Sequence, residues 1–115
     1  MHTKESIVAL LNRSYDKNDH RFVERSILAL YTLQTLDERK SIKTRHRNHL
    51  GFSVRTVKDG TYLGKWLATG KSLSGRFLNT AYAIAEIHAG QLARIANDES
   101  LRNRVQQNLR KTPGF

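Results

Sequence analysis

The longest helical pattern in the chain is SLSGRFLNTAYAIAEIHAGQLARIAN, which runs from Ser72 to Asn97. Apolar residues recur in it at intervals of three and four, which places them on one face of a helix. The members of this face are Phe77, Leu78, Ala81, Ile84, Ala85, Leu92 and Ile95. Six alanines add helix propensity and permit close packing. The pattern predicts one long helix that begins after Ser72 or Ser74 and ends near Asn97.

Four shorter helices are expected around the long one. Each is predicted from a capping or turn residue followed by apolar residues at helical spacing. The expected starts are Thr3, about His20, Gly60 or Thr61, and Asn97 or Asp98. Gly70 is placed to end the third of these helices, because glycine readily adopts the left-handed conformation that follows a helix. We therefore expect an all-α fold, a compact bundle of about five helices that forms a single domain over residues 1–115.

One long segment, residues 41–59, has no helical period. It is rich in Arg, Lys, His, Thr and Asn, and a long irregular segment in a compact domain usually has a function or is disordered. Its apolar residues are expected to hold it against the helices, and they are Leu50, Phe52, Val54 and Val57. Val54 and Val57 also suit a short extended run. The expected bundle is therefore interrupted by one long basic loop.

The positive charge of the chain is concentrated in its middle third. The formal net charge is +10, and residues 39–76 hold ten bases against a single acid, Asp59. Residues 1–38 hold five bases and six acids, and residues 77–115 hold five bases and three acids. Self-repulsion of this size weakens a fold, so a polyanionic partner is the simplest reason to carry it. A solubility device is the alternative.

Several classes of protein are disfavoured by what the sequence lacks. The chain has no cysteine, which excludes disulfides and thiolate metal sites. It has no long apolar run and no signal-peptide pattern, so we expect a cytoplasmic location and no membrane partner. A metal at His46 and His49 is disfavoured because carboxylates are almost absent nearby and the surrounding charge repels a cation. We expect no metal and no cofactor.

The first candidate nucleic-acid contact is the stretch KSIKTRHRNH, residues 40–49. Arginine grips a phosphate with two hydrogen bonds, whereas lysine acts as a point charge. Threonine, serine and asparagine add neutral contacts to phosphates or base edges. The candidate residues of this loop are Lys43, Arg45, His46, Arg47, Asn48 and His49. The alternative is a solvated charge run without a partner.

The second candidate contact is the turn at residues 71–76. Its start, Gly70-Lys71-Ser72, resembles the end of a phosphate loop, but position 65 is lysine where that motif needs glycine. A helix precedes it instead of a strand, so nucleotide hydrolysis is rejected. We expect the turn to present Lys71, Arg76 and the amides of a helix N-terminus to one phosphate.

Lys65 and Trp66 lie just before this turn, and Lys65 is a further candidate for a phosphate contact. An aromatic residue at helical spacing more often belongs to the core, and we expect Trp66 to pack there. The alternative is that Trp66 and Tyr62 stack on exposed bases.

No catalytic arrangement is recognisable, and we expect the protein not to be an enzyme. Asp37 and Glu38 are adjacent acids in a helix first turn, where the helix dipole explains them. Asp59 is isolated among bases and is expected to cap the following helix. The serines have no evident base and acid partner.

Three segments resemble a pattern in small phage and plasmid proteins. They are residues 44–52, TRHRNHLGF, residues 62–66, YLGKW, and residues 70–76, GKSLSGR. The loop of that family tends to read Thr-x-His-x-Asn-Gly-x-Gly-Phe, followed by a helix and a Gly-Arg/Lys-x-Leu turn. This chain departs from it with His49 at the first glycine, so the loop backbone must differ there. The resemblance implies an origin in a mobile element and favours DNA over RNA, but it identifies no reaction.

Two hypotheses follow for the function. The first is a DNA-binding accessory protein without catalytic activity, in which the loop at 43–49 and the turn at 71–76 form one basic face. In this hypothesis the bases neutralise phosphates, and the histidines and Asn48 add polar contacts. The second is a protein-binding inhibitor or adaptor, for example a factor that blocks a host defence complex with the same face.

Overall fold

The computed structural model describes residues 2–33, 52–53 and 55–110, and these residues confirm the all-α fold. Their helices are α1 (Lys4–Asp16), α2 (Arg21–Thr32), α4 (Val57–Ala68), α5 (Gly75–Ile87), α6 (Ala89–Asn97) and α7 (Glu99–Arg110). The described part of the chain thus has six helices, where about five were expected, and it has no strand. Most of the expected basic loop lies outside the described residues.

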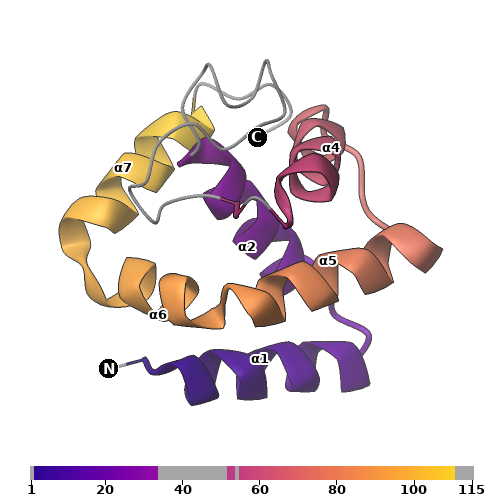
Figure 1. Cartoon of the computed structure of the whole chain (residues 1–115), viewed down its shortest axis with the longest axis horizontal. Helices are drawn as coiled ribbons and strands as arrows, with labels where there is room; N and C mark the ends of the chain where they lie inside the picture. The colour runs from indigo at the N-terminus through magenta and orange to yellow at the C-terminus, as the bar shows by residue number, and fades with distance from the viewer. Residues whose placement is uncertain (1, 34–51, 54, 111–115) are drawn as a thin grey trace.

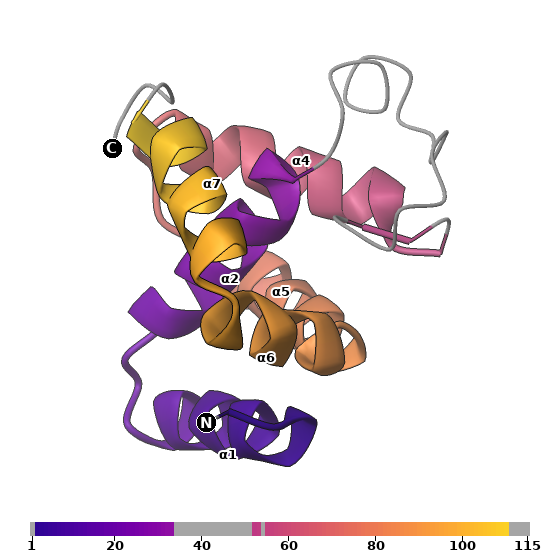
Figure 2. The same cartoon turned by 90° about the vertical axis from the view of Figure 1, so that its left-hand side faces the viewer.

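Helix α2 lies at the centre of the fold, and it contacts α1, α4, α5 and α7 (Figures 1 and 2). Its buried residues are Val23, Ser26, Ile27, Leu28, Ala29, Leu30 and Thr32. The two hydroxyls among them donate to backbone carbonyls of the same helix, Ser26 to Phe22 at 2.8 Å and Thr32 to Ala29 at 2.9 Å. A helix that is buried almost all round therefore holds its polar side chains with satisfied hydrogen bonds.

Helix α1 packs along α5 and α6 (Figure 1). Thr3 caps it as expected, because its hydroxyl accepts a hydrogen bond from the Ser6 amide and the Ser6 hydroxyl accepts one from the Thr3 amide. The backbone of His2 also exchanges two hydrogen bonds with the side chain of Asn97, at 2.8 and 2.6 Å. These contacts join the start of α1 to the end of α6.

The expected long helix is in fact two helices, α5 and α6, which meet at His88. His88 has φ −99° and ψ 19°, outside the helical range. Its ring nitrogen Nε2 is hydrogen-bonded to the hydroxyl of Thr56 at 2.9 Å, and the ring lies edge-on to Phe52. The imidazole is thereby drawn towards the segment before α4. The apolar spacing continues across this bend, so the sequence pattern gave no sign of it.

Helix α4 begins earlier than expected, at Val57 instead of Gly60. The cause is a turn that closes before it, in which the Ser53 carbonyl accepts from the Val57 amide at 2.8 Å and the Thr56 hydroxyl accepts from the Ser53 amide at 3.0 Å. Val57 is therefore helical, which corrects the expected extended run. Asp59 lies in the first helical turn and not at the cap, which is Thr56.

Phe52 and Val57 are buried, with 2% and 5% of their surfaces exposed, which confirms that they attach this segment to the helices. Leu50 and Val54, which were expected to do the same, lie outside the described residues.

Gly60 and Gly64 let α4 approach its neighbours closely. A Cβ atom on Gly60 would lie 2.5 Å from the ring of Phe52, and one on Gly64 would lie 2.4 Å from Cγ of Tyr31 on α2. Both distances are far below a carbon–carbon contact. The two glycines are one helical turn apart, so they form a narrow strip along which α4 is seated.

We expect Gly64→Ala to lower the free energy of unfolding by about 1–3 kcal/mol, because the methyl group must displace the ring of Tyr31. Gly90→Ala in α6 is the matched control, since a Cβ there meets nothing within 4 Å. The control is expected to stabilise the protein by about 0.4–1 kcal/mol through helix propensity and a less flexible unfolded chain. Urea denaturation followed by circular dichroism measures both, and equal stabilities would contradict the close approach.

Burial lowers the pKa of His88 below its ordinary value of 6.5. Between the two pKa values the unfolded chain binds a proton at this histidine and the folded chain does not. We therefore expect the free energy of unfolding to fall as the pH is lowered from 7 to 5, and to fall less in His88→Gln. Urea midpoints at both pH values measure the difference. The same pH dependence in wild type and variant would rule out this role of His88.

Candidate nucleic-acid interface

The outward face of α4 carries two aromatic and two basic side chains. Lys58, Tyr62, Lys65 and Trp66 follow one another at intervals that keep them on one side of the helix, and all four are exposed. The exposed fraction is 53% for Tyr62 and 37% for Trp66. The opposite face is buried and consists of Val57, Gly60, Thr61, Leu63, Gly64 and Leu67. The packing of α4 thus turns its aromatic residues towards solvent.

Phe77, in the first turn of α5, extends this face. Its ring stacks on that of Tyr62, with 5.7 Å between the ring centroids and 30° between the planes. The exposed fraction of Phe77 is 47%, so its expected place on the buried face of a helix is wrong. The physical reason is visible in Figure 1, where the start of α5 projects beyond the end of α1. The two exposed rings therefore bridge α4 and α5.

Trp66 is held at the surface by the turn that follows α4. Its indole N–H donates to the carbonyl of Ser72 at 3.0 Å, and the Lys71 ammonium lies 4.2 Å from the centroid of its ring. The second contact is a cation–π interaction. The expectation that Trp66 packs in the core is wrong, because the neighbouring positions Leu63 and Leu67 take the inward face.

The turn between α4 and α5 is fixed by a glycine and by a carboxylate. Gly70 has a φ of 87° directly after the cap of α4, which confirms it as the stop of this helix. Glu24 of α2 accepts a hydrogen bond from the Leu73 amide at 2.9 Å. That amide is therefore occupied by the protein itself. Leu73 precedes Ser74, the N-cap of α5, so this hydrogen bond leaves the expected contact of a phosphate with the amides of the helix N-terminus a prediction. Lys71 and Arg76 are both exposed.

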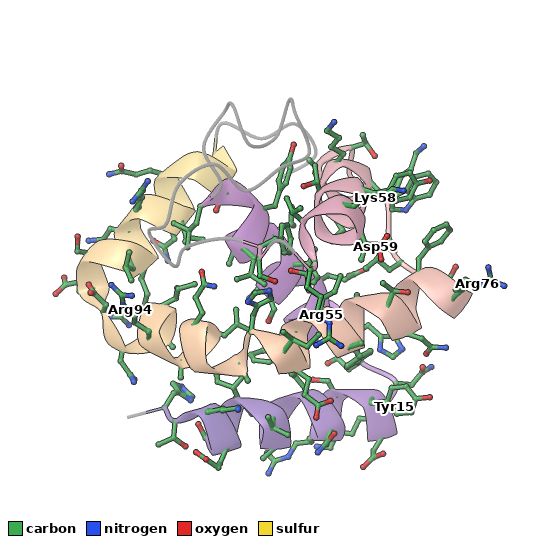
Figure 3. All side chains as sticks on the ribbon, in the orientation of Figure 1. Tyr15, Arg55, Lys58, Asp59, Arg76 and Arg94 are labelled. Carbon is green, nitrogen blue, oxygen red and sulfur yellow. The ribbon has the colours of Figure 1, made fainter. Side chains whose placement is uncertain are left out.

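Four exposed cations lie on the elements that carry the aromatic rings or on the turn between them, and they are Lys58 and Lys65 of α4, Lys71 of the turn and Arg76 of α5. Within the described ranges, none of them lies within ion-pair distance of a carboxylate, and the salt bridge that does form joins Arg21 to Asp19. In Figure 3, Lys58 projects from α4 and Arg76 from the start of α5, on the same side of the molecule. We call these four residues with Tyr62, Trp66 and Phe77 the aromatic–basic surface.

A pocket of about 230 Å³ lies on this surface beside Tyr62. Its lining consists of Lys58, Asp59, Thr61, Tyr62 and Lys65. It therefore combines an aromatic wall with two ammonium groups and one carboxylate, that of Asp59.

Four of the residues predicted from the sequence meet on the aromatic–basic surface, and they are Lys65, Trp66, Lys71 and Arg76. The other predicted contacts, Lys43, Arg45, His46, Arg47, Asn48 and His49, lie outside the described residues. Lys58 was not among the predicted contacts because the expected helix began only at Gly60 or Thr61. Phe77 was not among them because it was expected on the buried face of a helix. The spacing of four between Lys58 and Tyr62 was the available signal.

Comparisons with known proteins found no match to the chain among protein-family models, curated proteins or solved structures. In the part of the chain that the structure describes, no helix is long and apolar enough to cross a membrane. The chemistry of the aromatic–basic surface is therefore the basis for a functional proposal.

Trp66 is the single tryptophan of the chain, so its fluorescence reports on this surface. Because the cations raise the local concentration of anions, we expect iodide to quench Trp66 more strongly than caesium, each relative to free N-acetyltryptophanamide. Lys71→Gln should reduce this difference, since it removes the charge over the ring. Lys4→Gln on α1 is the control and should leave it unchanged. Equal relative quenching by both ions in the wild type would contradict a positive surface.

Proposed function

We propose that this protein binds nucleic acid, DNA in preference to RNA, as a non-catalytic accessory factor. The observation that supports the proposal is the aromatic–basic surface, which carries three exposed rings and four cations that form no ion pair with any carboxylate of the described residues. Phosphates are the natural counterpart of such cations, and bases are the natural counterpart of such rings. The preference for DNA and an origin in a mobile element are proposed from the resemblance of residues 44–52 and 70–76 to small phage and plasmid proteins.

Residues 43–49 lie outside the described residues, and their part in the proposal is based on their sequence. They belong to the same middle third that carries ten bases against one acid. Their arginines suit two-point contacts with phosphates, whereas the lysines of the aromatic–basic surface act as point charges. We propose that Arg45 and Arg47 add phosphate contacts to those of Lys65, Lys71 and Arg76.

A protein-binding inhibitor or adaptor is the second candidate. The exposed rings of Tyr62, Trp66 and Phe77 favour it, because exposed aromatic residues are the usual anchors of protein interfaces. The partner would present an acidic surface, so that complementary charge accelerates and orients the encounter.

Fluorescence-anisotropy titration with single-stranded DNA, duplex DNA and RNA at several salt concentrations tests the first proposal. We expect micromolar or tighter binding that weakens steeply with salt. Lys58→Ala/Lys65→Ala should weaken binding and reduce the log–log salt slope by about 1.4 on single strands or about 1.8 on duplex, because two phosphate contacts are lost. Lys4→Ala/Lys17→Ala removes the same charge from α1 and its C-cap, away from α4 (Figure 2), and should leave the slope unchanged.

An Arg45→Ala/Arg47→Ala variant in the same titration tests the loop, and we expect it too to bind more weakly with a smaller slope. Circular dichroism verifies that each variant is folded. An absence of binding to all three nucleic acids at low salt would overturn the proposal. A complex with an acidic protein that survives high salt would then favour the adaptor.

A further inference from the structure

We infer that the aromatic–basic surface takes unpaired bases, and that single-stranded nucleic acid is its ligand, with the stacked rings of Tyr62 and Phe77 as the base platform. This inference depends on the proposed function, because it names the class of nucleic acid that the same surface binds.

The platform of Tyr62 and Phe77 is already formed in the protein without a ligand. Tyr62 and Phe77 come from different helices, yet their planes are within 30° and their centroids 5.7 Å apart, an offset stack that orients both rings. About half of each side chain stays exposed despite this contact, 53% and 47%. A base that stacks on such rings covers apolar surface without first having to order two mobile side chains.

The bases of an intact duplex cannot stack on these rings. Successive bases in a duplex strand are stacked about 3.4 Å apart, so neither face of a base is open to a ring on a protein surface. Exposing one costs a few kcal/mol of unstacking. The bases of a single strand have open faces, and a stack on an aromatic side chain tolerates any base. Binding to duplex phosphates would involve the cations alone, and the three exposed rings would make no stacking contact with the ligand.

Trp66 lies one helical turn beyond Tyr62, about 6 Å further along the axis of α4. It offers a second stacking position on the same face. In the free protein the Lys71 ammonium covers one face of its ring at 4.2 Å. A base that takes this place releases the ammonium to a phosphate of the same strand. The exchange replaces one cation–π contact by a stack and an ionic contact.

The cations are placed for the backbone of the same strand. Lys58 and Lys65 line the pocket of about 230 Å³ beside Tyr62 together with Asp59, so a base against this ring lies near two ammonium groups and one carboxylate. Lys58 and Lys65 are two helical turns apart, about 10 Å along α4. The strand that we infer therefore runs along α4, with its bases towards the rings and its phosphates towards the lysines.

The test compares three probes in anisotropy titrations: a short oligothymidylate, an abasic oligonucleotide with the same number of phosphates, and a duplex of the same length. We expect wild-type protein to bind the oligothymidylate roughly 5- to 150-fold more tightly than the abasic strand, the range of one base–aromatic stack. We also expect quenching of Trp66 fluorescence by the oligothymidylate and little by the abasic strand.

The diagnostic variant is Tyr62→Leu/Phe77→Leu, which keeps apolar bulk at two exposed positions and removes the flat rings. It should lose most of the preference for the oligothymidylate and bind the abasic strand as the wild type does. Lys58→Ala/Lys65→Ala is the matched control, and it should weaken both probes by a similar factor. Circular dichroism and the urea midpoint verify the fold of each variant.

The outcomes separate this inference from the function on which it depends. Equal affinity of the wild type for the oligothymidylate and the abasic strand, or tighter binding of the duplex, would overturn the inference and leave nucleic-acid binding in place. A preference for the oligothymidylate that is undiminished in Tyr62→Leu/Phe77→Leu would overturn the platform, since stacking on Trp66 accounts only for a residual preference. An absence of binding to all three probes would remove the proposed function itself.

Discussion

The contact between Gly64 and the ring of Tyr31 fixes how α4 is rotated, and the exposed surface depends on that rotation. No side chain fits between this glycine and α2, because a Cβ atom would lie 2.4 Å from Cγ of Tyr31. The helix is therefore seated along its glycine strip, and the positions on its other side face solvent. A rotation by one residue, about 100°, would carry Tyr62 and Trp66 to the buried positions that Leu63 and Leu67 now hold. The packing that seats α4 on α2 thus also decides which of its side chains form the aromatic–basic surface.

The charge distribution follows the same division between interior and surface. The buried central helix α2 supplies apolar contacts, while the described cations of the middle third occupy exposed positions where water and salt screen their repulsion. These cations are Arg55, Lys58, Lys65, Lys71 and Arg76. Glu24 of α2 lies beside the turn that carries Lys71, and its carboxylate fixes that turn by accepting a hydrogen bond from the Leu73 amide. The turn is consequently attached to α2, and binding of an anion would relieve the repulsion among the exposed cations.

Local signals were sufficient to predict the helical class and several helix ends. Thr3 and Gly70 act within one turn of the chain, so their roles follow from neighbouring residues alone. The bend at His88 and the exposure of Phe77 depend on residues far apart in sequence, such as the partner Thr56 32 positions away. The same holds for the site: sequence identified the cations of the turn, but the aromatic face needed the rotation of α4, which tertiary packing decides.

The glycine strip also has an evolutionary consequence. Positions 60 and 64 admit no larger residue without a new arrangement of Phe52 and Tyr31, so selection should hold them to glycine. The exposed positions obey a looser rule: any flat ring serves at 62 and 77, and a cation can move to a neighbouring outward position without loss of field. Descendants of this chain are therefore expected to vary more at the exposed positions of the aromatic–basic surface than at positions 60 and 64, which packing holds to glycine.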